Sequence, residues 1–235
     1  MGEDRFFRFK RFQVRNERSA LKVGTDAVLL GAAMTLLPTD RNLLDIGTGT
    51  GVIALMAAQR MEPVPCRITG IDIDGPSADE ARYNFSLSPW PECLFAEQVA
   101  LADYRPAVKQ DCIFSNPPFY DNSLKNPDRR ESAARHTESL SYREICAFSA
   151  EHLAPQGRLS LILPAEEEKA LLRAAASFGL FPFRILRVRT TPAKPFRRII
   201  AEFSRKKGET SEEELTLGGS ARSEEYAALT TDFYL

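Results

Sequence analysis

The strongest restriction on the fold is a short apolar run that is followed by glycines at alternate positions. Residues 42–46 read Asn-Leu-Leu-Asp-Ile and predict a buried strand, and Gly47, Gly49 and Gly51 come directly after it. Glycine permits a tight turn because it has no Cβ, and the first amides of a helix after such a turn point toward a ligand. Residues 52–60 have a helical composition. The segment therefore predicts a strand, a tight turn and a helix around a ligand site.

Apolar runs alternate with helical patterns along most of the chain. We expect strands at residues 42–46, 67–72, 94–99, 111–115, 157–163, 183–190 and 196–203, and helices at 25–37, 52–60, 77–85, 142–153 and 165–178. Such alternation is typical of an α/β fold in which helices cover both faces of a mostly parallel sheet. The last two strands have no helix between them and should pair antiparallel. Ligands of such sheets bind beyond the carboxyl ends of the strands.

Composition excludes several other classes. The 235 residues are 43% hydrophobic, which is enough for one folded domain with a single core. The longest stretch without a charged side chain, residues 46–59, has 14 residues and is too short to cross a bilayer. The chain begins without an apolar leader, so we expect a cytoplasmic protein. Four widely spaced cysteines and two histidines argue against a metal site.

The first two strand ends carry acidic residues as well as glycines. A dinucleotide-binding turn needs Gly or Ala where this chain has Val52, so the pattern disfavours NAD. Asp45, just before the glycines, is suited to an ammonium group, and S-adenosylmethionine combines such a group with an adenosine. Asp72 lies 25 residues beyond Gly47, as expected for a carboxylate on ribose hydroxyls. The alternatives are a plain tight turn and, for Asp74, a helix cap.

The third strand end reads Asn116-Pro117-Pro118-Phe119. The prolines stiffen the chain, so that the Asn116 side-chain oxygen and the Pro117 carbonyl can both accept hydrogen bonds from one planar NH2 group. Such a grip draws the nitrogen toward pyramidal geometry and aims its lone pair at a methyl donor. Phe119 offers a ring on which a flat substrate can stack. The alternative is a simple turn with an Asn cap.

Together these motifs resemble the class I S-adenosylmethionine-dependent methyltransferases that act on amino groups. More closely, the chain resembles the bacterial tRNA1(Val) (adenine-37)-N6-methyltransferase family, because it also has Arg-Phe-Lys-Arg-Phe at 8–12, Lys-Val-Gly-Thr-Asp at 22–26, Ser-Pro-Trp at 88–90 and the 130–137 stretch. The resemblance implies a Rossmann-like, seven-stranded sheet whose last pair is antiparallel. It implies one methyltransferase domain over 1–235, with an N-terminal extension and leading helix (1–37), a catalytic core (38–205) and a C-terminal extension (206–235).

The resemblance also implies roles for individual residues. S-adenosylmethionine would be the cofactor, with no metal, and the residues around its methionine part would be Asp45, Gly47, Gly49 and Gly51. Asp72 would hold the ribose and Thr25 would lie near the methionine carboxylate, although Thr25 fits a helix N-cap equally well. Asp103 either binds the adenine amine or simply follows the residue that does so. Asn116 and Pro117 would hold the target N6, with Phe119 stacked on the base.

The charges are segregated along the chain although the net charge is −1. Residues 1–22 carry seven basic and three acidic side chains, residues 182–207 carry nine and one, and residues 208–235 carry one and seven. We expect a phosphate-binding stripe on the last two strands that includes Arg197 and Arg198, or else ordinary solvated charge. The polar 120–137 segment, with Arg129, Arg130 and Arg135, should close over a splayed-out base.

The two ends of the chain allow contrasting expectations. The aromatic and basic stretch at residues 6–14 either binds RNA or is a strand that packs its Phe side chains into the core. The acidic C-terminal residues should form a short helix near Ser223 that packs on the body.

The expected function is methylation of the N6 of an adenine in tRNA, at A37 in the anticodon loop, with no obligate protein partner and no membrane. The alternatives are N5-glutamine methylation of a protein such as a release factor, and a non-catalytic RNA-binding protein on the same scaffold. The cationic segments favour tRNA over a release factor, and the intact Asp45, Gly47, Gly49, Asp72 and Asn116 favour an enzyme.

Overall fold

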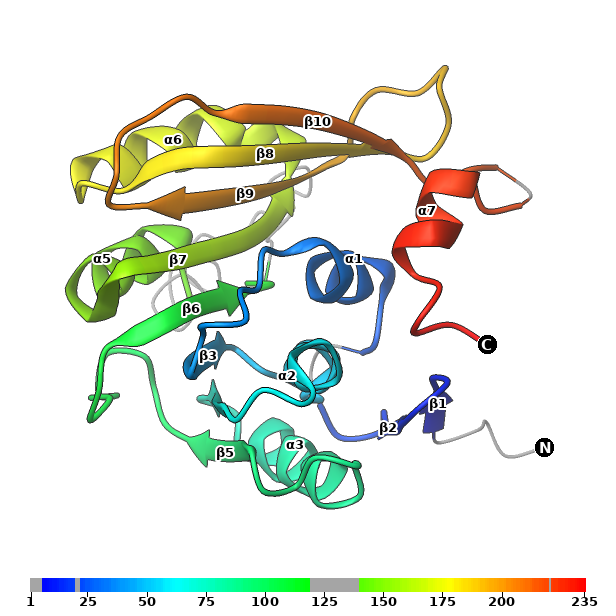
Figure 1. Ribbon diagram of the computed structural model, residues 1–235, viewed down its shortest axis with the longest axis vertical. Coiled ribbons are helices and arrows are strands. Elements are labelled where there is room, and N and C mark those ends of the chain that lie inside the picture. Colours follow the sequence, from blue (N-terminus) through cyan, green and yellow to red (C-terminus); the bar gives the residue numbers. More distant parts are fainter. Residues whose placement is uncertain (1–5, 20–21, 119–139, 220) are drawn as a thin grey trace, which may run out of the picture.

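The computed structural model describes residues 6–19, 22–118, 140–219 and 221–235 (Figure 1). Its strands are β1 (Phe6–Arg8), β2 (Gln13–Arg15), β3 (Asn42–Ile46), β4 (Arg67–Asp72), β5 (Leu94–Gln98), β6 (Gln110–Ser115), β7 (Leu153–Pro164), β8 (Phe181–Arg189), β9 (Arg198–Ser204) and β10 (Ser211–Thr216). Its helices are α1 (Thr25–Ala33), α2 (Val52–Met61), α3 (Gly75–Ser86), α5 (Tyr142–His152), the 3-10 turn η1 (Ala165–Glu167), α6 (Glu168–Ser177) and α7 (Glu224–Leu229).

The main sheet has the order β10-β8-β9-β7-β6-β3-β4-β5. Strand β9 runs antiparallel to both β7 and β8, while the other neighbours are parallel, so the α/β fold and the antiparallel last pair are confirmed. The expected count of seven strands is wrong by one. The eighth strand, β10, pairs with β8 at the sheet edge, and its sequence Ser-Glu-Glu-Glu-Leu-Thr lacks the apolar alternation that marks a strand.

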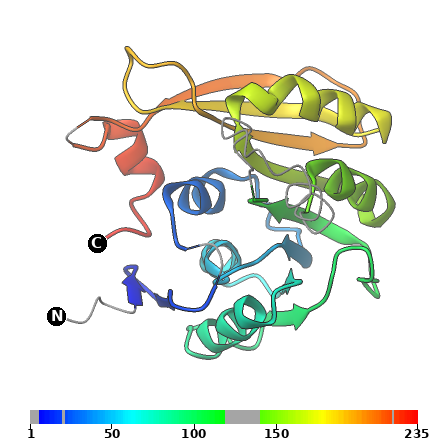
Figure 2. The ribbon, with the colours of Figure 1, turned by 180° about the vertical axis from the view of Figure 1, so that it is seen from behind.

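Helices cover both faces of this sheet, as Figures 1 and 2 show from opposite sides. One apolar core joins α1, α2 and part of α3 to the sheet, and the second joins α5 and α6 to the other face. The expected helix at 25–37 ends earlier, at Ala33. The Arg60 guanidinium donates to the carbonyl oxygens of Gly31 and Met34, both at 2.8 Å, and so satisfies acceptors that the helix end leaves open.

The parallel strands bring three chemically distinct segments to the edge of the sheet that is formed by the carboxyl ends of the strands. We call this the site edge. Asp45 is level with Gly70 on β4 and with Phe114 on β6, so β3, β4 and β6 end side by side. The Ser115 hydroxyl donates to the carbonyl oxygen of Ile46 at 2.6 Å, a direct link between two of these ends. Because β8 is parallel to β7, the loop at 190–197 leaves the sheet at this same edge.

The cationic segment at 182–207 is not a free phosphate-binding stripe. Strand β10 lies against β8 and neutralises its arginines, and α6 and β9 contribute further carboxylates. The ion pairs are Arg184 with Glu202 and Glu213, Arg187 with Glu168 and Glu212, and Arg189 with Glu214, at N···O distances of 2.6–3.1 Å. The segregation of charge along the sequence is therefore cancelled in space by parallel pairing of the two oppositely charged segments.

The two ends of the chain pack together on the body. Phe9 and Phe12 are buried in the core with stacked rings 4.5 Å apart, so the core alternative for the N-terminal stretch is confirmed. The Lys10 backbone N–H donates to the carbonyl oxygen of Phe233, which is also buried. Helix α7 begins at the expected place, with the Ser223 hydroxyl accepting from the Tyr226 N–H at 3.0 Å.

Replacing Glu212, Glu213 and Glu214 with glutamine should expose the arginines of β8 to polyanions. We expect the triple variant to elute from a heparin column at higher salt, because the arginines lose their β10 partners, while Glu202 and Glu168 still bind Arg184 and Arg187. Stability should fall only modestly, by about 1 kcal/mol or less per exposed pair. The control variant E209Q/E224Q/E225Q removes the same charge from exposed positions. Equal retention of the two variants would contradict the neutralising role of β10.

Candidate active site

A turn at residues 47–51 joins β3 to α2 and shapes the centre of the site. Gly47, Gly49 and Gly51 have φ values of 70°, 55° and 80°, in the left-handed region that favours glycine. The backbone N–H groups of Gly47 and Thr48 both donate to the carbonyl oxygen of Ile71, at 2.8 and 3.0 Å, and hold the turn against the end of β4. The sequence prediction of a strand, a tight turn and a helix is confirmed.

Gly51 is required for a second reason, which is close packing. A Cβ on this residue would lie 2.4 Å from the Phe85 ring and 3.3 Å from Ala81. Both neighbours belong to α3, so the absence of a side chain lets this helix approach the start of α2.

Asp45 is a completely buried carboxyl group beneath the turn. Its Oδ2 accepts a hydrogen bond from the Thr48 hydroxyl at 2.8 Å, and its Oδ1 has no partner. Burial raises the pKa of Asp45 to about 7, and Asp72 adds to the rise, while the Thr48 bond opposes it. A buried carboxylate with an open oxygen is suited to a cationic group, because a positive partner would offset the cost of desolvation.

Asp72 ends β4 and faces the glycine turn. Its Oδ2 accepts from the Gly49 N–H at 2.9 Å and its Oδ1 accepts from the Asp74 N–H at 3.0 Å. Burial raises the pKa of Asp72, and these backbone bonds oppose the rise. Asp74 caps α3 by accepting from the Ser77 N–H at 2.9 Å, so the helix-cap alternative for Asp74 is confirmed.

Ile73 is a candidate that the sequence analysis missed. It lies between Asp72 and Asp74 in the sequence, at the carboxyl end of β4, and is 62% exposed. It offers an exposed apolar side chain at the end of the strand that carries Asp72, which a flat ring could cover. The Ile-Asp-Ile-Asp pattern gave no signal, because either isoleucine of such a run could belong to the strand.

Asn116 and Pro117 follow the end of β6, beside the glycine turn. Asn116 is half-buried and Pro117 is buried, directly after Ser115 whose hydroxyl binds the end of β3. The geometry therefore brings the Asn-Pro-Pro segment to the edge that also carries Asp45 and Asp72. The predicted stacking residue Phe119 lies outside the described residues, as do Arg129, Arg130 and Arg135.

The other predicted site residues that the structure describes are Thr25, Asp103, Arg197 and Arg198, and they lie outside the three strand ends. Thr25 is exposed at the first position of α1, and the N-cap is Gly24, so the N-cap alternative for Thr25 is wrong. Asp103 is exposed in a turn after β5. Arg197 is exposed in the β8–β9 loop, whereas the Arg198 guanidinium binds the Asp26 carboxylate at 2.7 Å.

Neither a metal-ligand cluster nor a membrane-spanning helix is found in the described ranges. Within 6–19, 22–118, 140–219 and 221–235, no three His, Cys, Asp or Glu side chains gather as metal ligands would. The helices of these same ranges are all too short or too polar to pass through a bilayer.

The fold and the three strand ends define an S-adenosylmethionine-dependent methyltransferase of class I. In agreement, residues 19–176 match the methyltransferase small domain family. The chain is 39% identical over 232 residues to the tRNA1(Val) (adenine(37)-N6)-methyltransferase of Phocaeicola vulgatus, covering 98% of this chain and 97% of that protein. The enzyme of the same name from Photobacterium profundum is also 39% identical, with 97% and 98% covered. The chain belongs to this tRNA1(Val) (adenine(37)-N6)-methyltransferase family.

Solved structures agree on the fold. A predicted O-methyltransferase from Agrobacterium tumefaciens superposes with a TM-score of 0.67 at 17% identity, covering 88% of this chain and 96% of that chain. A methyltransferase from Pyrococcus furiosus has a TM-score of 0.57 at 19% identity, with 82% and 89% covered.

The Asp45→Asn variant should separate two effects of the buried carboxylate, its cost in folding free energy and its contribution to ligand binding. The folded-state pKa near 7 lies above the ordinary value of 3.8, so ionised Asp45 lowers stability progressively as pH rises between these values. We expect the Tm of the variant minus that of the wild type to increase from pH 4 to pH 8, because Asn cannot ionise but still accepts from Thr48. S-adenosylhomocysteine should bind the variant more weakly.

Differential scanning fluorimetry without ligand measures this difference, and the exposed Asp103→Asn serves as the control. A Tm difference for Asp45→Asn that is the same at both pH values would contradict the raised pKa.

Proposed function

We propose that this protein transfers the methyl group of S-adenosylmethionine to the exocyclic N6 of adenine 37 in the anticodon loop of tRNA1(Val), in the cytoplasm. The observation that carries the proposal is the Asn116-Pro117 pair at the end of β6, on the same sheet edge as Asp45 and Asp72. An acceptor pair beside a cofactor turn suits an amine substrate better than a hydroxyl or carbon substrate, because both N–H hydrogens can be held at once.

The carboxylates and the glycine turn at the strand ends fit the parts of the cofactor. The open Oδ1 of the buried Asp45 suits the ammonium group of the methionine part, and the turn at Gly47–Gly51 allows close approach to the backbone. Asp72 has both oxygens oriented by backbone N–H groups and suits the ribose hydroxyls. Thr25 and Asp103 are assigned to the methionine carboxylate and the adenine amine by family resemblance alone.

Catalysis in this proposal depends on orientation rather than on a strong base. S-adenosylmethionine, when bound, supplies an electrophilic methyl group on a sulfonium. The Asn116 side-chain oxygen and the Pro117 carbonyl accept hydrogen bonds from the two N–H groups of N6. These bonds turn the nitrogen lone pair toward that methyl group. After transfer the nitrogen is cationic and acidic, so its proton can leave to solvent. Phe119 is assigned to stack on the base.

Within residues 182–207, fewer cations are available for tRNA than the sequence suggested, because the β8 arginines form ion pairs. Lys194 and Arg197 are exposed in the loop at 190–197, at the sheet edge of the site, and Arg189 packs its guanidinium 4.9 Å from the Phe196 ring centroid. We assign Lys194 and Arg197 to phosphate contacts. Arg198 instead orders the start of α1 through Asp26. The assignments of Arg129, Arg130 and Arg135 to RNA rest on the sequence alone.

The decisive experiment is methylation of total tRNA that lacks modifications, with labelled S-adenosylmethionine, followed by mapping of the labelled nucleotide. Label at N6 of A37 in tRNA1(Val) is expected. Label on purified release factor but not on tRNA would replace the proposal with N5-glutamine methylation. Binding of tRNA with no S-adenosylmethionine binding would indicate a non-catalytic RNA-binding protein.

Asn116→Ala should reduce kcat by about a hundredfold, as expected when one pre-organised hydrogen-bonding group is removed from an active site. The Kd for S-adenosylhomocysteine should stay within about twofold, because Asn116 is assigned to the substrate amine and not to the cofactor. Single-turnover methylation of tRNA measures the first quantity and calorimetry the second. An unchanged single-turnover rate would remove Asn116 from the mechanism.

Lys194→Ala combined with Arg197→Ala should weaken tRNA binding at low salt and reduce the slope of log K against log salt by about two, one for each lost phosphate contact. Lys206→Ala combined with Lys207→Ala is the matched control, since both lysines are exposed near the end of β9, on the far side of the sheet from the site edge. Filter binding over a salt series measures both. Identical slopes for the two double variants would exclude the 190–197 loop from the tRNA interface.

A further inference from the structure

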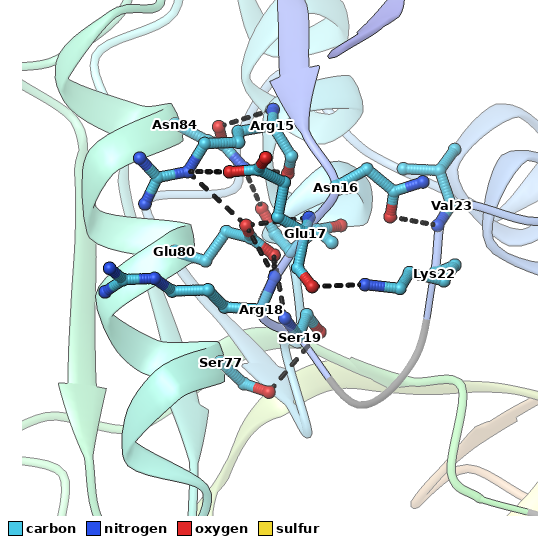
Figure 3. A network of polar contacts seen from close by, with 11 residues as sticks. Arg15, Asn16, Glu17, Arg18, Ser19, Lys22, Val23, Ser77, Glu80 and Asn84 are labelled. Atoms are coloured by element: carbon cyan, nitrogen blue, oxygen red, sulfur yellow. Dashed lines mark hydrogen bonds and ion pairs between the residues drawn. The ribbon is translucent and has the colours of Figure 1, made fainter. Parts of the chain in front are cut away.

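One face of α3 binds the backbone of a distant segment, residues 15–19, which connects β2 to the start of α1 (Figure 3). Glu80 on this helix has a completely buried side chain. Its carboxylate accepts from three successive backbone N–H groups, those of Glu17 at 2.9 Å, Arg18 at 3.0 Å and Ser19 at 2.8 Å. These bonds define a tight turn at 17–19, which we call the Glu80 turn.

Asn84, one helical turn further along α3, ties the same segment to the glycine turn. Its side-chain oxygen accepts from the Arg15 N–H at 2.8 Å, and its amide donates to the carbonyl oxygens of Arg15 at 3.0 Å and Thr50 at 2.9 Å. Thr50 lies between Gly49 and Gly51. One side chain therefore sets the distance between residue 15 and the turn assigned to the cofactor.

A chain of hydrogen bonds runs from the Glu80 turn to the carboxylate assigned to the ribose. The hydroxyls of Ser19 and Ser77 are 3.3 Å apart, and the Ser77 hydroxyl donates to Asp74 Oδ2 at 2.7 Å. The Asp74 N–H in turn donates to Asp72 Oδ1. The same Asp72 accepts from Gly49 through its other oxygen.

The other end of the segment leads to α1. Asn16 Oδ1 accepts from the Val23 N–H at 3.0 Å, and the Lys22 ammonium donates to the carbonyl oxygen of Glu17 at 2.6 Å. Val23 lies two residues before Thr25, the residue assigned to the methionine carboxylate. The Glu80 turn thus stands between two groups of the cofactor site that are far apart in sequence.

The electrostatic surroundings of Glu80 indicate that this residue positions the backbone of residues 17–19 rather than stabilising the core. Burial acts to raise the pKa of Glu80, but the N–H groups of Arg18, Ser19 and Glu17 outweigh it and hold the pKa below its ordinary value. Arg15 Nε, 3.4 Å from Glu80 Oε1, acts in the same direction. A buried charge contributes little net stability compared with an apolar side chain. It does hold three backbone N–H groups in one geometry, which an apolar residue could not do.

We propose that Glu80 is a positioning residue for cofactor binding, which orients Asp72 and the start of α1 through the Glu80 turn. The inference rests on the cofactor site of the proposed function and does not involve RNA. It predicts that cofactor affinity depends on Glu80 although no cofactor contact is assigned to this residue.

Glu80→Gln in the full chain tests this role, because Gln keeps the shape but turns an NH2 group toward backbone N–H donors. We expect S-adenosylhomocysteine to bind the variant about tenfold or more weakly in calorimetry, within the usual range for coupling between sites. The KM for S-adenosylmethionine should rise by a similar factor, with kcat at saturation within about twofold of the wild type.

Glu202→Gln is the matched control. Glu202 on β9 is equally buried and accepts from the Thr35 N–H and the Ser160 hydroxyl at 2.8 and 2.7 Å. It also accepts from the Arg184 guanidinium at 2.8 Å, and none of these groups is assigned to the cofactor. It should lower Tm as Glu80→Gln does, while its affinity for S-adenosylhomocysteine stays within about twofold of the wild type. Trypsin gives a second readout, since cleavage after the exposed Arg18 should accelerate only in Glu80→Gln.

Equal affinities for the wild type and Glu80→Gln would overturn the proposal, and so would an equal loss of affinity in Glu80→Gln and Glu202→Gln. If Glu80→Gln does not fold, Ser77→Ala decides: it removes the Ser77 hydroxyl from the chain of hydrogen bonds and should weaken binding about threefold or more. Unchanged affinity in that variant would also overturn the proposal. A wild type that binds S-adenosylhomocysteine but methylates no tRNA would contradict the proposed function alone.

Discussion

The turn between β3 and α2 is the constraint on which the rest of the structure depends. Its three glycines have positive φ values, and its first two N–H groups bind the end of β4. This geometry holds the β3 and β4 ends together, and the Ser115 hydroxyl adds the end of β6. Close packing of Phe85 over Gly51 then brings α3 near the turn, which places Glu80 and Asn84 within reach of residues 15–19.

Buried carboxylates in this protein have two different kinds of surroundings. Glu80 and Glu202 are surrounded by donors, so their charge organises the backbone and neighbouring side chains. Asp45 accepts from one side chain, the Thr48 hydroxyl, and burial raises its pKa to about 7. An incompletely paired buried acid costs folding free energy, and such costs tend to occur where a ligand will supply the missing partner. The contrast supports the proposed assignment of Asp45 to the cationic part of the cofactor.

The distribution of cations illustrates the difference between a charged sequence and a charged surface. Residues 182–207 carry nine basic side chains, but three arginines of β8 bind carboxylates of β10, α6 and β9. Pairing of an acidic edge strand with a basic one covers an exposed sheet edge and satisfies both sets of charges. Within residues 182–207, the exposed cations at the site edge are Lys194 and Arg197, and both belong to a loop rather than to a stripe.

The sequence by itself determined the local units: the alternation of strands and helices, the glycine turn, the cap at Asp74, and the acidic and Asn-Pro-Pro strand ends that parallel pairing brings to one edge. These follow from backbone preferences and from side-chain patterns within a few residues. Only the tertiary structure decided that Ser211–Thr216 forms a strand, that Phe9 and Phe12 are core residues, and that Glu80 binds residues 17–19. Each depends on a partner far away in the chain. These partners are the arginines of β8 for Ser211–Thr216, the C-terminal Tyr234 ring for Phe9, and three backbone amides for Glu80. No local pattern encodes such a partner, because long-range contacts are selected by the packing of the whole fold.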